Sequence, residues 1–395
     1  MNESPASQAR TTGVADGARP GFSRCGVCLL LLSAAGISIS LVWDFSWEST
    51  VGVDLVWSLP HAANYFSVLL AGVTALGLVI ATTRTPTARA GAVRLGRLHA
   101  PLAAWIVLWG ALAFAVAVLF DRWWQSAYGL AAGIWHPPQI FKAVAFFAVV
   151  VGVWLFCLHR QQRVVGENRF GGAAAFAIAG GLLLALITVV TVTSIYPNRQ
   201  HSAAFFKIAC GTYPLVLVAL ATSGESRWPA TTAAAIYTLI LGAMVWVLPL
   251  IPAQPQVAPI YNPLDHLIPL PFPLLLIVPA LGLDVLLRKL SWPAQRARLW
   301  RQAGAAGLAF FILFFATQWC FAEFLLSDLA DNWFFAGGGQ HWPFFLKISP
   351  AARVAFWKTP GDELDLANGL MAAGLALLAA GAGGWLGAWM KRVRR

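Results

Sequence analysis

The sequence predicts an all-α polytopic membrane protein, with about ten transmembrane helices arranged as five tandem helical hairpins and both termini cytoplasmic. Three observations lead to this prediction. Hydrophobic residues make up 59% of the 395 residues and charged residues only 11%, too few charges to cover the surface of a soluble protein. Apolar runs of membrane-spanning length recur along the chain. Basic residues gather in alternate connections between these runs.

The apolar runs define the predicted spans, because a helix needs about 20 residues to cross the hydrocarbon core of a bilayer. They lie at 25–43, 61–83, 98–120, 139–157, 171–195, 203–222, 229–251, 267–287, 304–326 and 367–390. Pro269, Pro271 and Pro273 interrupt the eighth run, so we expect no regular helix there. Irregular backbone at such depth is tolerated only beside protein or water. We therefore expect Asp265 and His266 to border an internal cavity or a re-entrant segment.

The net charge of +11 indicates topology. Most of the 27 Lys and Arg fall in the N-terminal tail, at the C-terminus and in the connections that follow even-numbered spans. By the positive-inside rule these segments are cytoplasmic, which predicts a multi-pass protein of a bacterial-type cytoplasmic (inner) membrane. The expected partners are the lipid bilayer, anionic lipids at the cytoplasmic face and other membrane subunits. No nucleic-acid partner is expected.

The chain divides into a tail and one membrane domain. Residues 1–24 are polar and predict a disordered cytoplasmic tail ahead of an uncleaved first span. Residues 25–395 form a single transmembrane domain. Its predicted hairpin repeats are 25–97, 98–169, 170–228, 229–303 and 304–395.

Each of the five outer connections contains one histidine, at similar intervals along the chain. These histidines are His61, His136, His201, His266 and His341. A lysine follows six residues after three of them, as Lys142, Lys207 and Lys347. A shared register of this kind indicates internal duplication.

The first two outer connections resemble each other over a longer stretch. They read WDFSWESTVGVDLVWSLPH and FDRWWQSAYGLAAGIWHPPQ, with Asp44 matching Asp121 and Gly52 matching Gly129 at the same spacing. The second copy has lost acidic residues, because Gln125 and Ala131 stand where the first copy has Glu48 and Asp54. The first connection is therefore expected to dominate any site that the repeat builds.

The repeated histidines predict a metal site that faces the periplasm. Imidazole is the commonest side-chain ligand for copper, zinc, iron and nickel, and carboxylates complete or orient such sites. Copper is the first candidate, zinc is the second, and iron also fits. The protein would then be a membrane metalloenzyme or a metal-handling protein. The candidate ligands are the five outer histidines together with Asp44, Glu48, Asp54, Asp121 and Asp265.

Two other functions fit the same residues. A transporter or permease for a small or hydrophobic solute would use Lys142, Lys207, Lys347 and Glu323 to line a cavity or bind substrate. A structural or assembly subunit of a larger membrane complex would use histidine and tryptophan only to cap helices and anchor them at the headgroups. The sequence contains no nucleotide-binding or haem-attachment motif, so no nucleotide cofactor is expected and haem is disfavoured. Catalytic residues are not assigned.

Overall fold

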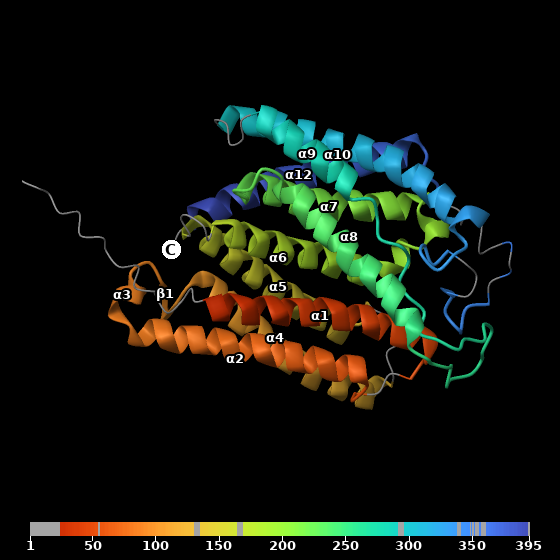
Figure 1. Ribbon diagram of the computed structural model, residues 1–395, viewed down its shortest axis with the longest axis horizontal. Coiled ribbons are helices and arrows are strands. Elements are labelled where there is room, and N and C mark those ends of the chain that lie inside the picture. The colour runs from red at the N-terminus through yellow and green to blue at the C-terminus, as the bar shows by residue number, and fades with distance from the viewer. Residues whose placement is uncertain are drawn as a thin grey trace, which may run out of the picture.

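The computed structural model is a bundle of long helices that lie side by side (Figure 1). The structure describes residues 24–53, 56–129, 135–163, 169–290, 296–337, 341–347, 349, 351, 355–356 and 361–393. Nine helices in these ranges are long and apolar enough to cross a membrane. The predominantly helical class is therefore confirmed, and the nine candidate spans indicate a multi-pass membrane protein. The predicted tail lies outside the described residues except for Arg24, and so does the candidate ligand Asp54.

The nine long helices are α1 (Arg24–Thr50), α2 (Leu59–Arg84), α4 (Leu102–Tyr128), α5 (Pro137–Arg163), α6 (Arg169–Val190), α7 (Ala203–Ser223), α8 (Pro229–Val247), α10 (Arg296–Leu325) and α12 (Leu366–Arg392). The short helices are α3 (Pro86–Arg89), α9 (Ile277–Lys289), η3 (Val192–Ser194), η4 (Pro197–Arg199), η5 (Leu248–Leu250) and η6 (Asp328–Ala330). Strands β1 (Val93–Leu95) and β2 (Leu98–Ala100) form a small antiparallel hairpin after α3. Strand β2 occupies the first residues of the predicted third span, 98–120, and the helix itself begins only at Leu102.

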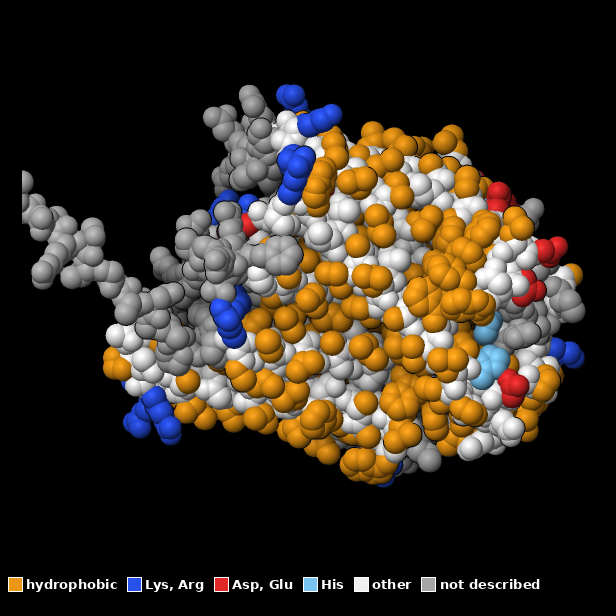
Figure 2. All heavy atoms as spheres, in the orientation of Figure 1, with side chains coloured by type: hydrophobic (Ala, Val, Ile, Leu, Met, Phe, Trp, Pro, Cys, Tyr) orange, Lys and Arg blue, Asp and Glu red, His pale blue; other side chains and the backbone are white. Residues whose placement is uncertain are grey.

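Side-chain types are segregated along the bundle (Figure 2). On the face shown, most Lys and Arg lie at the end that holds α3 and β1, which we call the basic end. Asp, Glu and His gather at the opposite end, which we call the histidine end. A broad apolar surface separates the two ends on this face. Large apolar side chains of the long helices, such as Leu119 and Phe66, are more than half exposed. Such a surface matches a hydrocarbon environment.

The eighth predicted span is not a continuous helix. Residues 252–276 form neither a helix nor a strand, and the helical part of the predicted span is limited to the 13 residues of α9. The prolines explain the interruption, because each one removes a backbone donor and disfavours helical geometry in the residue before it. The irregular backbone expected in the eighth run is therefore confirmed, and the expected total of about ten crossings stays a prediction.

The part of this segment that lies within the predicted span, residues 267–276, is enclosed by protein. Leu267, Ile268 and Leu274 are fully buried. Three of its backbone N–H groups donate to side chains of neighbouring helices: Ile268 N to Thr50 Oγ1, Leu274 N to the Tyr237 hydroxyl, and Leu275 N to Gln318 Oε1. Side chains of α1, α8 and α10 thus replace the hydrogen bonds that a helix would have made.

Small residues set the closest helix contacts. Gly110 of α4 lies against the backbone of Val149 in α5, and Gly152 of α5 lies in the same way against Val107 of α4. Glycines of α12 approach the backbone of α7 as closely, and α7 packs more extensively against α12 than against α6. The expected third hairpin, 170–228, is therefore not a tightly packed pair, because the small residues that permit close approach lie on α12.

Candidate metal centre

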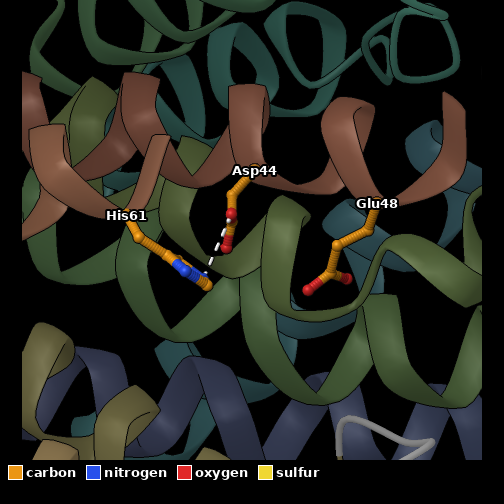
Figure 3. Close-up of side chains that lie close together, drawn as sticks. All are labelled: Asp44, Glu48 and His61. Atoms are coloured by element: carbon orange, nitrogen blue, oxygen red, sulfur yellow. Dashed lines mark ion pairs between the residues drawn. The ribbon is translucent and has the colours of Figure 1, made fainter. Parts of the chain in front are cut away.

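Three of the predicted ligands meet at the histidine end of the first hairpin. Asp44 and Glu48 lie one turn apart on α1, and His61 reaches towards them from α2 (Figure 3). One ligand atom from each side chain lies within 4.8 Å of the other two, and His61 Nε2 is 3.3 Å from Asp44 Oδ1. We call these three residues the first-hairpin cluster. Ligands around one transition metal lie about 3 to 4 Å apart, so small side-chain rotations would complete a site.

The local backbone positions this cluster. Helix α1 ends at Thr50, and Gly52 follows with φ of +76°, a conformation that favours glycine. Helix α2 starts with Ser58 as its N-cap, and the Ser58 side chain accepts a hydrogen bond from the backbone N–H of His61. The imidazole of His61 therefore projects from the first turn of α2, opposite the last two turns of α1.

The electrostatics of the cluster favour a bound cation. The side chains of Asp44 and His61 are only 16% and 15% exposed, whereas Glu48 is open to solvent. Asp44 Oδ1 is buried and accepts no hydrogen bond from the described residues. A divalent ion bound between the two carboxylates and the imidazole would be attracted by the negative charge of Asp44 and Glu48.

The second hairpin carries the matching residues with different partners. Gly129 ends α4 with φ of +84°, as Gly52 does after α1, and Asp121 stands eight residues before it as Asp44 does before Gly52. Asp121 Oδ2 is 2.8 Å from Lys142 Nζ and accepts a hydrogen bond from Gln125 Nε2. An ammonium group and an amide thus bind Oδ2 of the second aspartate, whereas its Oδ1 is buried and, like Asp44 Oδ1, accepts no hydrogen bond from the described residues.

The last two outer histidines form a second grouping. The rings of His266 and His341 are edge to face, with centroids 5.5 Å apart. Asp265 Oδ1 is 2.6 Å from His266 Nδ1, and this hydrogen bond lowers the pKa of Asp265. Burial lowers the pKa of His341 to about 4, helped by His266 and opposed by Asp331, so His341 is neutral at pH 7. We call His266 and His341 the histidine pair.

His201 has a packing environment. Its ring stacks between Trp319 and Phe356, at centroid distances of 3.8 and 3.5 Å, and its Nε2 is 3.1 Å from the Trp319 carbonyl oxygen. Burial lowers the pKa of His201, while the Trp319 carbonyl and the charge of Glu323 oppose that shift. Glu323 itself is exposed in the last turn of α10.

The other candidates are placed separately. His136 is half-buried just before α5, and Lys207 is half-buried in the second turn of α7. Lys347 lies in an exposed loop, with its Nζ 5.9 Å from the centre of the Tyr261 ring. Lys142 and Lys207 thus lie near the starts of long helices, whereas Lys347 lies outside the helices, in the segment that precedes α12.

Sequence analysis missed the partner of Asp121. Lys142 was assigned to a substrate or lipid site, yet it pairs with Asp121 across α4 and α5. Comparison of the two repeats could have revealed this pair. The second hairpin keeps the aspartate and has no counterpart of Glu48, and it has a lysine six residues after its histidine, where the first hairpin has Ser67. The chain matches no protein-family model, no curated protein and no solved structure.

Proposed function

We propose that this chain is a multi-pass protein of a bacterial cytoplasmic membrane that binds a divalent transition metal at Asp44, Glu48 and His61, on the periplasmic face. The observation that carries the proposal is the convergence of these three ligand types within 4.8 Å. Three protein ligands leave at least one coordination position for water or substrate. Catalytic metal sites share this open arrangement, whereas structural sites are closed, so a membrane metalloenzyme is favoured over a storage role.

The second hairpin supports the proposal. At the matched place, Lys142 puts a positive charge 2.8 Å from Asp121. In the first hairpin the residue six positions after the histidine is Ser67, whose hydroxyl donates to the Ala63 carbonyl oxygen instead. In the second hairpin a lysine lies beside the aspartate, and in the first hairpin His61 lies beside it and Glu48 lies close by. A metal ion bound at the first-hairpin cluster would place a positive charge beside Asp44, as Lys142 does beside Asp121.

The donor set narrows the choice of metal. An imidazole nitrogen with two carboxylate oxygens suits copper(II), zinc or iron(II), and lacks the thiolate or thioether that selects copper(I). Copper(II) has the highest affinity for such sites among the divalent first-row ions. We therefore propose copper(II) first and zinc second.

Metal titration of the full-length apoprotein in mild detergent tests the proposal. Asp44→Asn, Glu48→Gln and His61→Ala are each expected to weaken copper(II) binding at this site at least tenfold. Glu363→Gln and His136→Ala are the matched controls, since both residues lie at the histidine end outside the cluster. Equal affinity in all five variants and the wild type would reject the site, and would favour a structural or assembly role.

Transport is the second candidate function, and the interrupted crossing formed by residues 252–276 and α9 favours it. Discontinuous helices near the middle of the membrane bind substrates and coupling ions in many secondary transporters. Here Tyr213, Thr188 and Tyr237 add a buried hydroxyl chain that ends on the backbone of Leu274.

Cysteine accessibility separates transport from a sealed metal site. Leu274→Cys, in a background without the natural cysteines, is labelled by a membrane-impermeant maleimide in proteoliposomes only if the segment opens to water. Trp57→Cys at the exposed histidine end is the positive control. Labelling of Leu274→Cys supports transport, and its absence beside a labelled control argues against transport.

A further inference from the structure

We infer that His266 and His341 form a second transition-metal site, separate from the first-hairpin cluster. Ligation would use His266 Nε2 and His341 Nδ1. The bound ion would be copper or zinc, held by two imidazoles. This inference goes beyond the proposed function and does not depend on it.

The geometry of the histidine pair is that of two ligands of one ion. Metal–nitrogen bonds of about 2.0–2.1 Å place the ring centres of two coordinating imidazoles about 5 to 6 Å apart. The rings of His266 and His341 are 5.5 Å apart. His266 Nε2 and His341 Nδ1 are both buried, and neither has a hydrogen-bond partner within the described part of the chain. Buried ring nitrogens without partners are costly unless something binds them.

Asp265 supplies the support that metal-binding histidines usually have. Its Oδ1 lies 2.6 Å from His266 Nδ1, so His266 donates this N–H and keeps Nε2 as the basic nitrogen. The Asp265 side chain is 88% exposed, so it orients the His266 ring with little loss of its own hydration. A carboxylate that accepts a hydrogen bond from a histidine and so orients its ring is a recurrent arrangement around bound metals.

The backbone holds both histidines in place. An isolated antiparallel bridge joins Pro252 to His266, with Leu267 N donating to the Ile251 carbonyl oxygen and Ala253 N to that of Asp265. The segment after His341 is fixed to the same region, because Tyr261 N and Asn262 N both donate to the Phe344 carbonyl oxygen. The two chain segments are thus fastened together next to the histidine pair, which reduces the entropy lost when a metal binds.

The coordination number directs the choice of metal. Two imidazoles suit copper(I) at low coordination, and copper(II) or zinc once water or a further ligand completes the site. The first-hairpin cluster offers one imidazole, whereas the histidine pair offers two. The number of coordinated nitrogens therefore identifies which site an ion occupies.

Copper(II) titration of the untagged full-length apoprotein, followed by electron paramagnetic resonance, tests the inference. The wild type is expected to show a component with hyperfine splitting from two nitrogens. His266→Ala/His341→Ala should lose that component and about one copper per chain, whereas the His136→Ala control should keep both. A variant with Asp44→Asn, Glu48→Gln and His61→Ala should keep the two-nitrogen component. The two-nitrogen component can therefore be detected even if the first-hairpin cluster binds no metal.

If the double variant does not fold, Asp265→Asn provides a second test. The Asp265 side chain is exposed and contributes little to packing, so this variant is expected to fold. Loss of the orienting carboxylate is expected to weaken copper binding at the two-nitrogen site by about 10- to 100-fold. The inference is overturned if the wild type shows no two-nitrogen component. An unchanged two-nitrogen signal and affinity in both the double variant and Asp265→Asn would overturn it equally.

Discussion

Replacement of Lys142 by methionine tests the charge pairing inside the second hairpin. Methionine keeps the length and apolar stem of lysine and removes the ammonium group that lies 2.8 Å from Asp121 Oδ2. At that distance the Coulomb energy is about 6 kcal/mol for an effective dielectric constant of about 20. The cost of desolvating the two charges offsets part of this Coulomb energy. Removal of one partner from a buried ion pair lowers the unfolding free energy by about 3–5 kcal/mol. Gln125 still donates to Asp121, so we expect a loss of about 3 kcal/mol.

Reversible unfolding by sodium dodecyl sulfate from mixed micelles measures the change. Arg122→Met is the matched control, because Arg122 is an exposed basic residue next to Asp121. Adding Asp121→Asn to the Lys142→Met variant should restore most of the lost stability, since no unpaired charge then remains. The reasoning is refuted if Lys142→Met unfolds like the wild type, or if the second substitution restores nothing.

Three further predictions follow from the packing and the metal site. Gly383→Leu should lower the unfolding free energy by about 1–3 kcal/mol or more, because the new Cβ would overlap the Leu215 carbonyl oxygen. Gly374→Leu, on the open face of the same helix, should leave the unfolding free energy unchanged. Equal unfolding midpoints for the two variants would contradict the close contact. Tyr237→Phe should cost about 1–3 kcal/mol in the same assay, because the Leu274 N–H loses its acceptor; an unchanged midpoint would mean that water replaces the hydroxyl. Copper(II) at about 100 times its dissociation constant should stabilise the wild type by about 2.7 kcal/mol, and a variant lacking the first-hairpin cluster should gain less.

The sequence was sufficient for the features that depend on local composition. Apolar runs identified nine long helices, and the three alternate prolines identified the place where the eighth crossing is not helical. Both follow from the chemistry of single segments in lipid. The close contact of α7 with α12 was not predictable in this way, because it joins segments far apart in the chain and depends on which face of α7 the glycines of α12 meet.

The candidate site also has a part that could be predicted from the sequence and a part that could not. Asp44, Glu48 and His61 lie in adjacent helices joined by a short connection, so their spacing in sequence already indicated proximity. The contact between His266 and His341 depends on two outer segments of different hairpins, and spacing alone does not give it. The expected assembly of histidines from several hairpins is replaced by separate groups, of which His201 is held in an aromatic stack.

Metal content of the protein as isolated tests the central claim most directly. Untagged wild-type protein and a variant carrying Asp44→Asn, Glu48→Gln and His61→Ala are purified in mild detergent, shown to be folded and monodisperse, and measured by mass spectrometry. The account predicts that the wild type carries about one more copper or zinc ion per chain than the variant. Equal metal content in the two folded proteins, or metal at background in both, would contradict it.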